Sequence, residues 1–134
     1  MSKRKTLMPI AIVAALLMTA CSSNQDSQTE TLAMPDKNEI TLINPFVVPE
    51  AKLDETIDMW LQARDFLQMQ PGYISTELHQ SVAPDATFRL INVAKWESPE
   101  TFKAATAKMN AEAGLPRIEG LVPNPALYTV AKRD

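Results

Sequence analysis

The chain has 134 residues, of which 46% are hydrophobic, and its 13 basic and 16 acidic residues give a net charge of −3. This length allows one domain and not two. The acidic balance argues against nucleic acid as a partner, because a negative surface repels phosphate. A single cysteine and a single histidine argue against an intrachain disulfide and against a metal site built from this chain alone.

Residues 1–20 are predicted to be a secretory signal peptide. Lys3, Arg4 and Lys5 form a positive start, and an uncharged, mostly apolar run follows over residues 7–20. That run is shorter than the roughly 20 apolar residues that a membrane-spanning helix needs. Beyond it, 10 basic and 16 acidic residues remain, a net charge of −6. Anionic lipids attract basic segments, so this part of the chain is not held to a membrane by its charge.

The signal ends at Cys21. The preceding run, Leu16-Leu17-Met18-Thr19-Ala20, resembles a lipobox, the processing site of bacterial lipoproteins, although Met18 replaces the more usual leucine or valine. The resemblance implies a diacylglyceryl group on the cysteine sulfur and an anchor in the lipid bilayer on the periplasmic side of the cell envelope, since two or more acyl chains anchor a protein stably. The alternative is an ordinary signal peptide with a cysteine nearby.

A polar stretch over residues 22–37 follows the cysteine. Such a stretch cannot bury enough apolar surface to offset the entropy of ordering it. We therefore expect a lipidated cysteine and flexible tether over residues 21–38 and one domain over residues 39–134.

Three elements are predicted in the first half of that domain. Ile40–Val48 is rich in β-branched residues and predicts a strand. Leu53–Met69 places its apolar residues on one broad helical face, and Pro71-Gly72 ends this helix. Tyr73–Ser81 alternates apolar and polar residues, which predicts a second strand.

Three more elements complete the pattern. Phe88–Trp96 predicts a third strand. Ser98 and Pro99 supply a capping hydroxyl and a first-turn proline for a helix over Pro99–Ala113, and Ala126–Lys132 predicts a last strand. The order β-α-β-β-α-β is the ferredoxin-like motif of the α+β class.

Two of the predicted strands are apolar on both faces. In the third strand Leu90 and Ala94 alternate with Ile91 and Val93, and the first strand behaves likewise. Two helices cover only one face of such a sheet, and a face exposed to water would be more polar. We therefore expect a second copy of the chain to cover the other face, in a homodimer.

Several segments together resemble the antibiotic biosynthesis monooxygenase (ABM) domain family over residues 39–132. They are the runs Leu42-Ile43-Asn44-Pro45-Phe46-Val47-Val48-Pro49, Gln70-Pro71-Gly72-Tyr73-Ile74-Ser75-Thr76, Leu78-His79 and Asn92-Val93-Ala94-Lys95-Trp96-Glu97-Ser98, followed by Phe102. The resemblance implies a dimeric α/β barrel. It also implies oxygenase activity, with neither metal nor flavin, on an electron-rich aromatic molecule. In such enzymes the substrate anion reduces oxygen, while the protein supplies an apolar pocket, a group that helps deprotonate a phenol, and hydrogen-bond donors.

A second branch of this family binds and degrades haem. It uses an Asn on the first strand, a Trp at the end of the third strand and a His on the second helix. Asn44 and Trp96 match the first two, but the helix predicted over Pro99–Ala113 has no histidine. The missing ligand argues against haem chemistry.

Asn44 and His79 are the candidate catalytic residues. Pro45 follows Asn44 inside a predicted strand, where it removes a ladder hydrogen bond and predicts a bulge or break that could turn the amide toward a site. The alternative is a structural bend in which Asn44 satisfies a free backbone group. His79 carries the chain's one imidazole, a group that can accept a phenolic proton near neutral pH. The alternative is that His79 is a polar residue near a strand end.

Four further residues are candidates for a substrate pocket: Trp60, Arg89, Asn92 and Trp96. The two tryptophans are large enough to line a cavity, although such side chains more often serve packing. Asn92 interrupts an apolar strand face and needs a partner if buried. The sequence thus predicts a cofactor-independent monooxygenase of a phenolic or quinol-like molecule. The alternative is a ligand-binding or assembly module without catalysis, because a fold does not fix a function.

Overall fold

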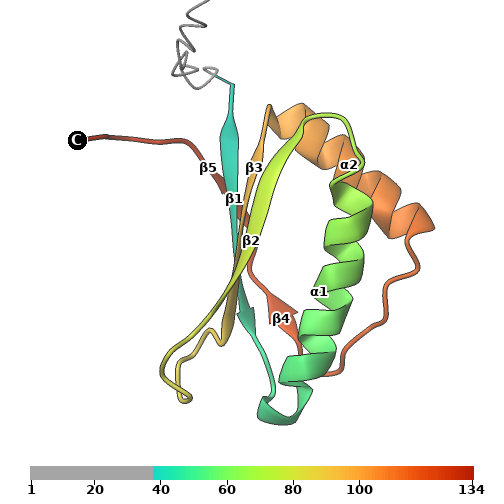
Figure 1. Cartoon of the computed structure of the whole chain (residues 1–134), viewed down its shortest axis with the longest axis vertical. Helices are drawn as coiled ribbons and strands as arrows, with labels where there is room; N and C mark the ends of the chain where they lie inside the picture. Colours follow the sequence, from blue (N-terminus) through green and yellow to red (C-terminus); the bar gives the residue numbers. More distant parts are fainter. Residues whose placement is uncertain (1–37) are drawn as a thin grey trace, which may run out of the picture. The chain divides into compact units, whose positions relative to one another are not determined.

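The computed structural model of the chain describes residues 38–134. The elements in chain order are β1 (Ile40–Val47), the short 3-10 helix η1 (Glu50–Lys52), α1 (Leu53–Leu67), β2 (Tyr73–Gln80), β3 (Leu90–Trp96), α2 (Pro99–Glu112), β4 (Val122–Pro123) and β5 (Ala126–Tyr128). The predicted helices and the first three strands are confirmed, with ends within two residues of those expected. The last strand is shorter than predicted, because the chain leaves the sheet after Tyr128 (Figure 1).

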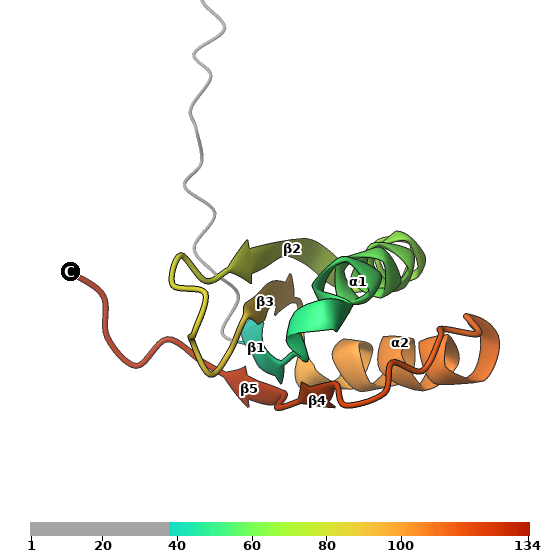
Figure 2. The ribbon, with the colours of Figure 1, turned by 90° about the horizontal axis from the view of Figure 1, so that it is seen from below.

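The strands form one antiparallel sheet in the order β2-β3-β1-β4, and β5 also pairs with β1. Both helices lie on the same side of this sheet (Figure 2). The ferredoxin-like α+β fold expected from the element order is therefore confirmed. The central position of β1 and β3 gives them helices on one face and neighbouring strands on both edges.

Local sequence explains where α2 begins and how the chain enters β2. The Ser98 hydroxyl accepts a hydrogen bond from the Thr101 N–H at 3.2 Å, and Pro99 occupies the first turn. Gly72 has a φ of 83°. A Cβ there would collide with the side chain of Thr101, so this turn needs glycine both for its backbone and for its close approach to α2.

The edge strand beside β1 is interrupted opposite Asn44 and Pro45. Ile43 pairs with Ala126 and Phe46 pairs with Pro123, so β4 and β5 keep one register on either side of the gap. Pro45 has no N–H to donate there. The sequence predicted a bulge or break in β1 itself. That prediction was wrong, because β1 pairs continuously with β3, and only the neighbour on its other edge is broken.

The core lies between the sheet and the helices. One buried cluster contains Ile40, Leu42, Ala94, Trp96 and Ala105, and a second contains Phe46, Val48 and Leu90. Trp96 is only 1% exposed and meets the rings of Tyr73 and Phe102 edge-on, with centroids 5.6 and 5.7 Å away. Fully burying one large apolar side chain contributes about 1.5–3 kcal/mol, so these clusters dominate the packing energy.

Neither α1 nor α2 covers the opposite face of the sheet (Figure 2), and this face carries apolar side chains. Ile43 and Val93 are paired neighbours there and are half-buried, while Val47 and Val122 are exposed to 37% and 49%. The sheet is open at β2 and at β4. One copy of residues 38–134 therefore does not close a barrel, and the predicted dimeric barrel requires a second copy.

The predicted signal peptide, Cys21 and nearly all of the tether lie outside the described residues. Within residues 38–134, neither helix has the length and hydrophobicity to cross a membrane.

Candidate functional site

A cavity of about 380 Å³ lies between the helices and the buried face of the sheet. It falls at the lower end of the range of about 300–1,000 Å³ usual for ligand pockets. All the main elements except β5 and η1 contribute to its lining. The lining residues are Leu42, Asn44, Phe46, Met59, Trp60, Ala63, Arg64, Leu67, Tyr73, Thr76, Asn92, Ala94, Trp96, Phe102, Thr106, Met109, Asn110, Leu115, Leu121, Pro123 and Pro125.

Two carboxamides lie side by side in this lining. Asn44 of β1 pairs with Asn92 of β3, so their side chains share the helix-covered face. Asn92 is 9% exposed, and its Oδ1 accepts a hydrogen bond from the Thr76 hydroxyl at 2.7 Å. The Asn44 Oδ1 accepts from the Asn124 N–H at 3.0 Å. Each amide thus uses its oxygen within the protein, and its NH₂ group remains as a donor.

Asn124 connects Asn44 to the proline that follows it. The Asn124 N–H also donates to the Pro45 carbonyl at 2.9 Å, so it is shared between the strand and the Asn44 side chain. This contact agrees with the structural alternative given by the sequence, while a catalytic role of Asn44 stays a prediction. Asn44 satisfies a backbone group at the interrupted edge, and it lines the cavity.

Aromatic side chains form much of the remaining wall. Trp96, Tyr73 and Phe102 make a contiguous edge-to-face group at one side of the cavity. On α1, the Arg64 guanidinium lies 5.7 Å from the ring centroid of Trp60, a cation–π contact. These rings offer flat apolar surfaces of the kind that bind aromatic molecules.

Two predicted site residues lie elsewhere. His79 pairs with Ile91 on the uncovered face of the sheet, and its Nε2 is 3.5 Å from a Glu77 carboxylate oxygen. Arg89 donates to the Ala83 carbonyl at 3.0 Å in the loop between β2 and β3. Neither residue lines the cavity, so the structure does not combine them with Asn44 in one site. Strand alternation places His79 beside Glu77, and the pairing with β3 places both of them on the face opposite the one that carries Asn44.

The sequence pattern of the antibiotic biosynthesis monooxygenase (ABM) family matches residues 39–114, which is more than half of the chain. The chain belongs to the ABM family. Among curated proteins no relative matches it.

Solved structures of ABM-like proteins share this fold. A candidate monooxygenase from Shewanella loihica PV-4 is 50% identical, with a TM-score of 0.66, over 72% of this chain and 97% of that one. SnoaB, a cofactor-independent oxygenase from Streptomyces nogalater, is 22% identical with a TM-score of 0.54, over 72% and 96%. The haem-degrader MhuD from Mycobacterium tuberculosis is 21% identical with a TM-score of 0.56, over 71% and 98%. At these last two identities the likeness shows the fold alone.

Sequence reasoning missed several residues that line the cavity between the helices and the sheet, which we call the ABM cavity. Thr76 and Arg64 both line it. Thr76 could have been found, because it lies on the inward-facing register of its strand, and Arg64 lies one helical turn after Trp60. Leu115 and Leu121 come from the segment between α2 and β4 and carry no local signal, since irregular segments have no periodicity to read.

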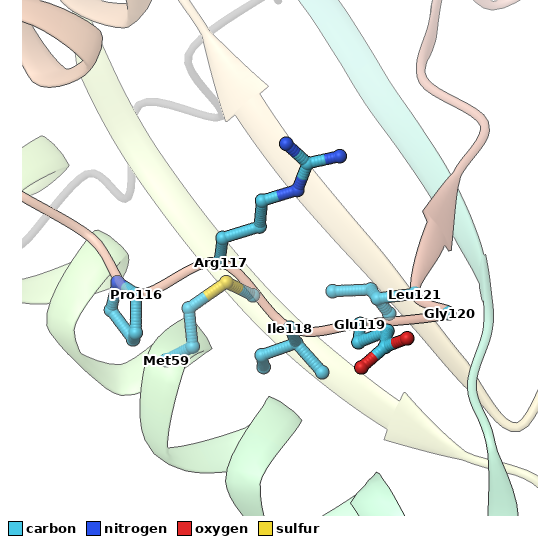
Figure 3. Close-up of a pocket in the computed structure, with 7 residues that line it drawn as sticks. All are labelled: Met59, Pro116, Arg117, Ile118, Glu119, Gly120 and Leu121. Atoms are coloured by element: carbon cyan, nitrogen blue, oxygen red, sulfur yellow. The ribbon is translucent and has the colours of Figure 1, made fainter.

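A second, more open hollow of about 640 Å³ adjoins the ABM cavity. Figure 3 shows its lining, which consists of Met59 from α1 and the side chains of residues 116–121. Met59 and Leu121 line both spaces, so the cavity and the hollow are neighbours. The hollow has no aromatic wall and is open to solvent. We therefore take the less open, aromatic-walled cavity with its two amides as the candidate site.

The ion pair between Lys52 and Glu55 lies outside the cavity. At the start of α1 the pKa of Lys52 is raised by its hydrogen bond to Glu55 and by the charge of that carboxylate, with a smaller contribution from Glu119. The Lys52 side chain lies in none of the cavity-lining positions. This ion pair belongs to the exposed end of the helix, where such pairs contribute little to stability.

Proposed function

We propose that this chain is a cofactor-independent monooxygenase that oxidises a phenolic or quinol-like aromatic molecule in the cavity beneath α1 and α2. The observation that carries the proposal is the pairing of Asn44 and Asn92 in an aromatic-walled cavity, each with an uncommitted NH₂ group. Membership of the ABM family supports the reaction class. The fold shared with SnoaB is consistent with it.

The reaction that fits this site starts from a phenolate. The anion transfers an electron to O₂, and the resulting radicals combine to form a bond between a ring carbon and oxygen. Loss of the proton on that carbon and cleavage of the O–O bond then give a quinone and hydroxide. One oxygen atom stays on the ring, and the other leaves as hydroxide, so the substrate supplies every electron that O₂ takes up. Preorganised amide donors stabilise the negative charge as it moves from the phenolate to the peroxide.

Oxygen uptake measured against a panel of hydroquinones, phenols and hydroxynaphthalenes tests this proposal. Ala63→Phe should block turnover, because Ala63 lines the cavity from α1 and a larger side chain fills it. Ala104→Phe is the matched control, since Ala104 is exposed on α2. If the wild type binds these molecules and consumes no oxygen, a ligand-binding module without catalysis becomes the better assignment.

We also propose that the uncovered face of the sheet forms a homodimer, which would complete the α/β barrel expected for this family. The half-buried Ile43, Ile91 and Val93 on that face support it, because apolar groups at a sheet centre favour a dry partner surface. Sedimentation at micromolar concentration should give a dimer. Val93→Asp should give a monomer, while Val82→Asp, in a fully exposed loop position, should leave the dimer intact. A monomeric wild type would contradict the proposal.

We propose finally that acylation of Cys21 holds this domain on the periplasmic side of a membrane in the cell envelope. The lipobox-like residues before Cys21 support the proposal, as does the polar stretch after it. An anchor of this kind would present the cavity to small aromatic molecules near the membrane.

A further inference from the structure

We propose that the cavity takes up its substrate as a hydroxyaromatic anion that has already lost its proton in solution. Within residues 38–134, the lining offers hydrogen-bond donors and one cation, with no carboxylate, imidazole or amine that could remove a phenolic proton. This inference rests on the proposed function and narrows its substrate class. It selects hydroxyaromatic compounds acidic enough to ionise at the working pH, such as those with an electron-withdrawing carbonyl on the ring.

The polar groups of the lining come from both helices and from β1, β2 and β3. β1 and β3 contribute the amides of Asn44 and Asn92, and α2 contributes Thr106 and Asn110. The segment between α2 and β5 contributes leucines and prolines. From α1 comes the guanidinium of Arg64, and from β2 come the hydroxyls of Tyr73 and Thr76. Within residues 38–134, no Asp, Glu, His or Lys lines this space.

His79, Glu77, Asp65 and Glu119 are proton acceptors that lie outside the lining. His79 and Glu77 are together on the opposite face of the sheet. Asp65 accepts hydrogen bonds from the Nε and Nη2 of Arg64, at 2.9 and 2.7 Å, with its own side chain 59% exposed. Glu119 lines the open hollow outside the cavity. A tyrosine phenol such as that of Tyr73 is a weak proton acceptor, because it must first lose its own proton.

The charge of the cavity lining is opposite in sign to the net charge of the domain. Residues 38–134 contain 9 basic and 13 acidic residues, a net charge of −4. The guanidinium and the amide NH₂ groups of the cavity lining can donate hydrogen bonds to an anion, although the domain as a whole is acidic. The Arg64 side chain is 37% exposed and paired with Asp65, so its own contribution is modest. Asn92, at 9% exposure, is the more enclosed donor.

The proton balance of the reaction follows from this lining. The substrate O–H bond breaks in water and its proton goes to solvent, after which the anion enters the cavity. Donors hydrogen-bonded to the charged form favour that form, so the substrate pKa falls on binding. The pH at half-maximal kcat/KM should then lie at the solution pKa of the substrate and differ from one substrate to another.

Binding of 4-nitro-1-naphthol to the full chain tests the inference independently of turnover. Its nitro group makes the ring resistant to oxidation, and the absorption band of its anion reports its protonation state directly. We expect the bound dye to ionise at a pH at least one unit below its solution pKa. Arg64→Gln should weaken anion binding by roughly two- to fivefold, and the matched Arg117→Gln, on the outer hollow, should leave it unchanged. Binding of the dye as its neutral phenol, or absence of binding, would overturn the inference.

Oxygen uptake supplies the second test, with two hydroxynaphthalenes whose hydroxyl pKa values differ by about two units. The midpoint of the pH profile should move with the substrate, and His79→Ala should leave it in place. A midpoint that stays the same for both substrates would show that a protein group takes the proton and would refute the inference. If the dye binds as its anion and neither compound is oxidised, the oxygenase proposal fails while the anion preference stands.

Discussion

Removal of the Asn44 side chain should reduce catalysis with little effect on folding. Its NH₂ group is one of two paired amide donors in the cavity, and loss of one preorganised donor typically costs about 2.7–4 kcal/mol of transition-state stabilisation. Asn44→Ala should therefore lower the rate of oxygen uptake roughly a hundred- to thousandfold. The Asn124 N–H keeps the Pro45 carbonyl at 2.9 Å as a partner, so the free energy of unfolding should fall by less than about 1 kcal/mol.

Asn92→Ala should give a different combination of effects. Its Oδ1 is the acceptor for the Thr76 hydroxyl at 2.7 Å, in a site where Asn92 is 9% exposed. The substitution leaves that hydroxyl without this partner, which costs about 1–3 kcal/mol of folding free energy in addition to the loss of rate. If both amides act on the same developing charge, the double variant should lose less activity than the product of the two single losses.

Oxygen-electrode rates and urea unfolding curves on the same preparations separate these effects. Gln62→Ala removes an exposed carboxamide from α1 and serves as the control, with wild-type rate and stability expected. The reasoning is refuted if Asn44→Ala oxidises a substrate of the wild type at the wild-type rate. An Asn44→Ala variant that loses several kcal/mol of stability would instead assign the residue a structural role.

Three further predictions concern the core, a turn and the anchor. Trp96→Ala should lower the free energy of unfolding by about 3–5 kcal/mol in urea titrations, because a 1%-exposed ring is lost from the main cluster; a loss below about 1 kcal/mol would contradict this packing. Gly72→Ala should destabilise by more than the ~1–2 kcal/mol of a positive φ, since its Cβ would meet Thr101, and partial recovery in a Gly72→Ala/Thr101→Ala variant would confirm the contact as the cause. Cys21→Ser should release the chain from membranes or leave it unprocessed, and equal membrane retention and gel mobility of both forms would disprove the lipid anchor.

The sequence by itself determined the order and class of both helices and of β1, β2, β3 and β5, while the short β4 was not predicted. The two-residue alternation in β2, the mainly apolar run of β3, the broad apolar face of α1 and the Ser98-Pro99 start of α2 are local signals, each readable within about a dozen residues. The same alternation placed His79 with Glu77 on one side of its strand. It also placed Asn92 among apolar residues of β3, which marked it as a polar group in need of a partner.

Only the tertiary structure decided which polar residues share a site. The strand pattern gives two faces, but which of them the helices cover depends on packing between distant segments, and this separated His79 and Arg89 from Asn44 and Asn92. The interruption beside Pro45 lies in the neighbouring edge strand and not in β1, because either strand of a pair can accommodate a missing N–H. The contact between residues 44 and 124 has no signature in the local sequence. Within residues 38–134, the lack of Asp, Glu, His and Lys in the cavity lining depends on the same long-range packing, because it emerges only when residues from β1, β2, β3, α1 and α2 surround one space.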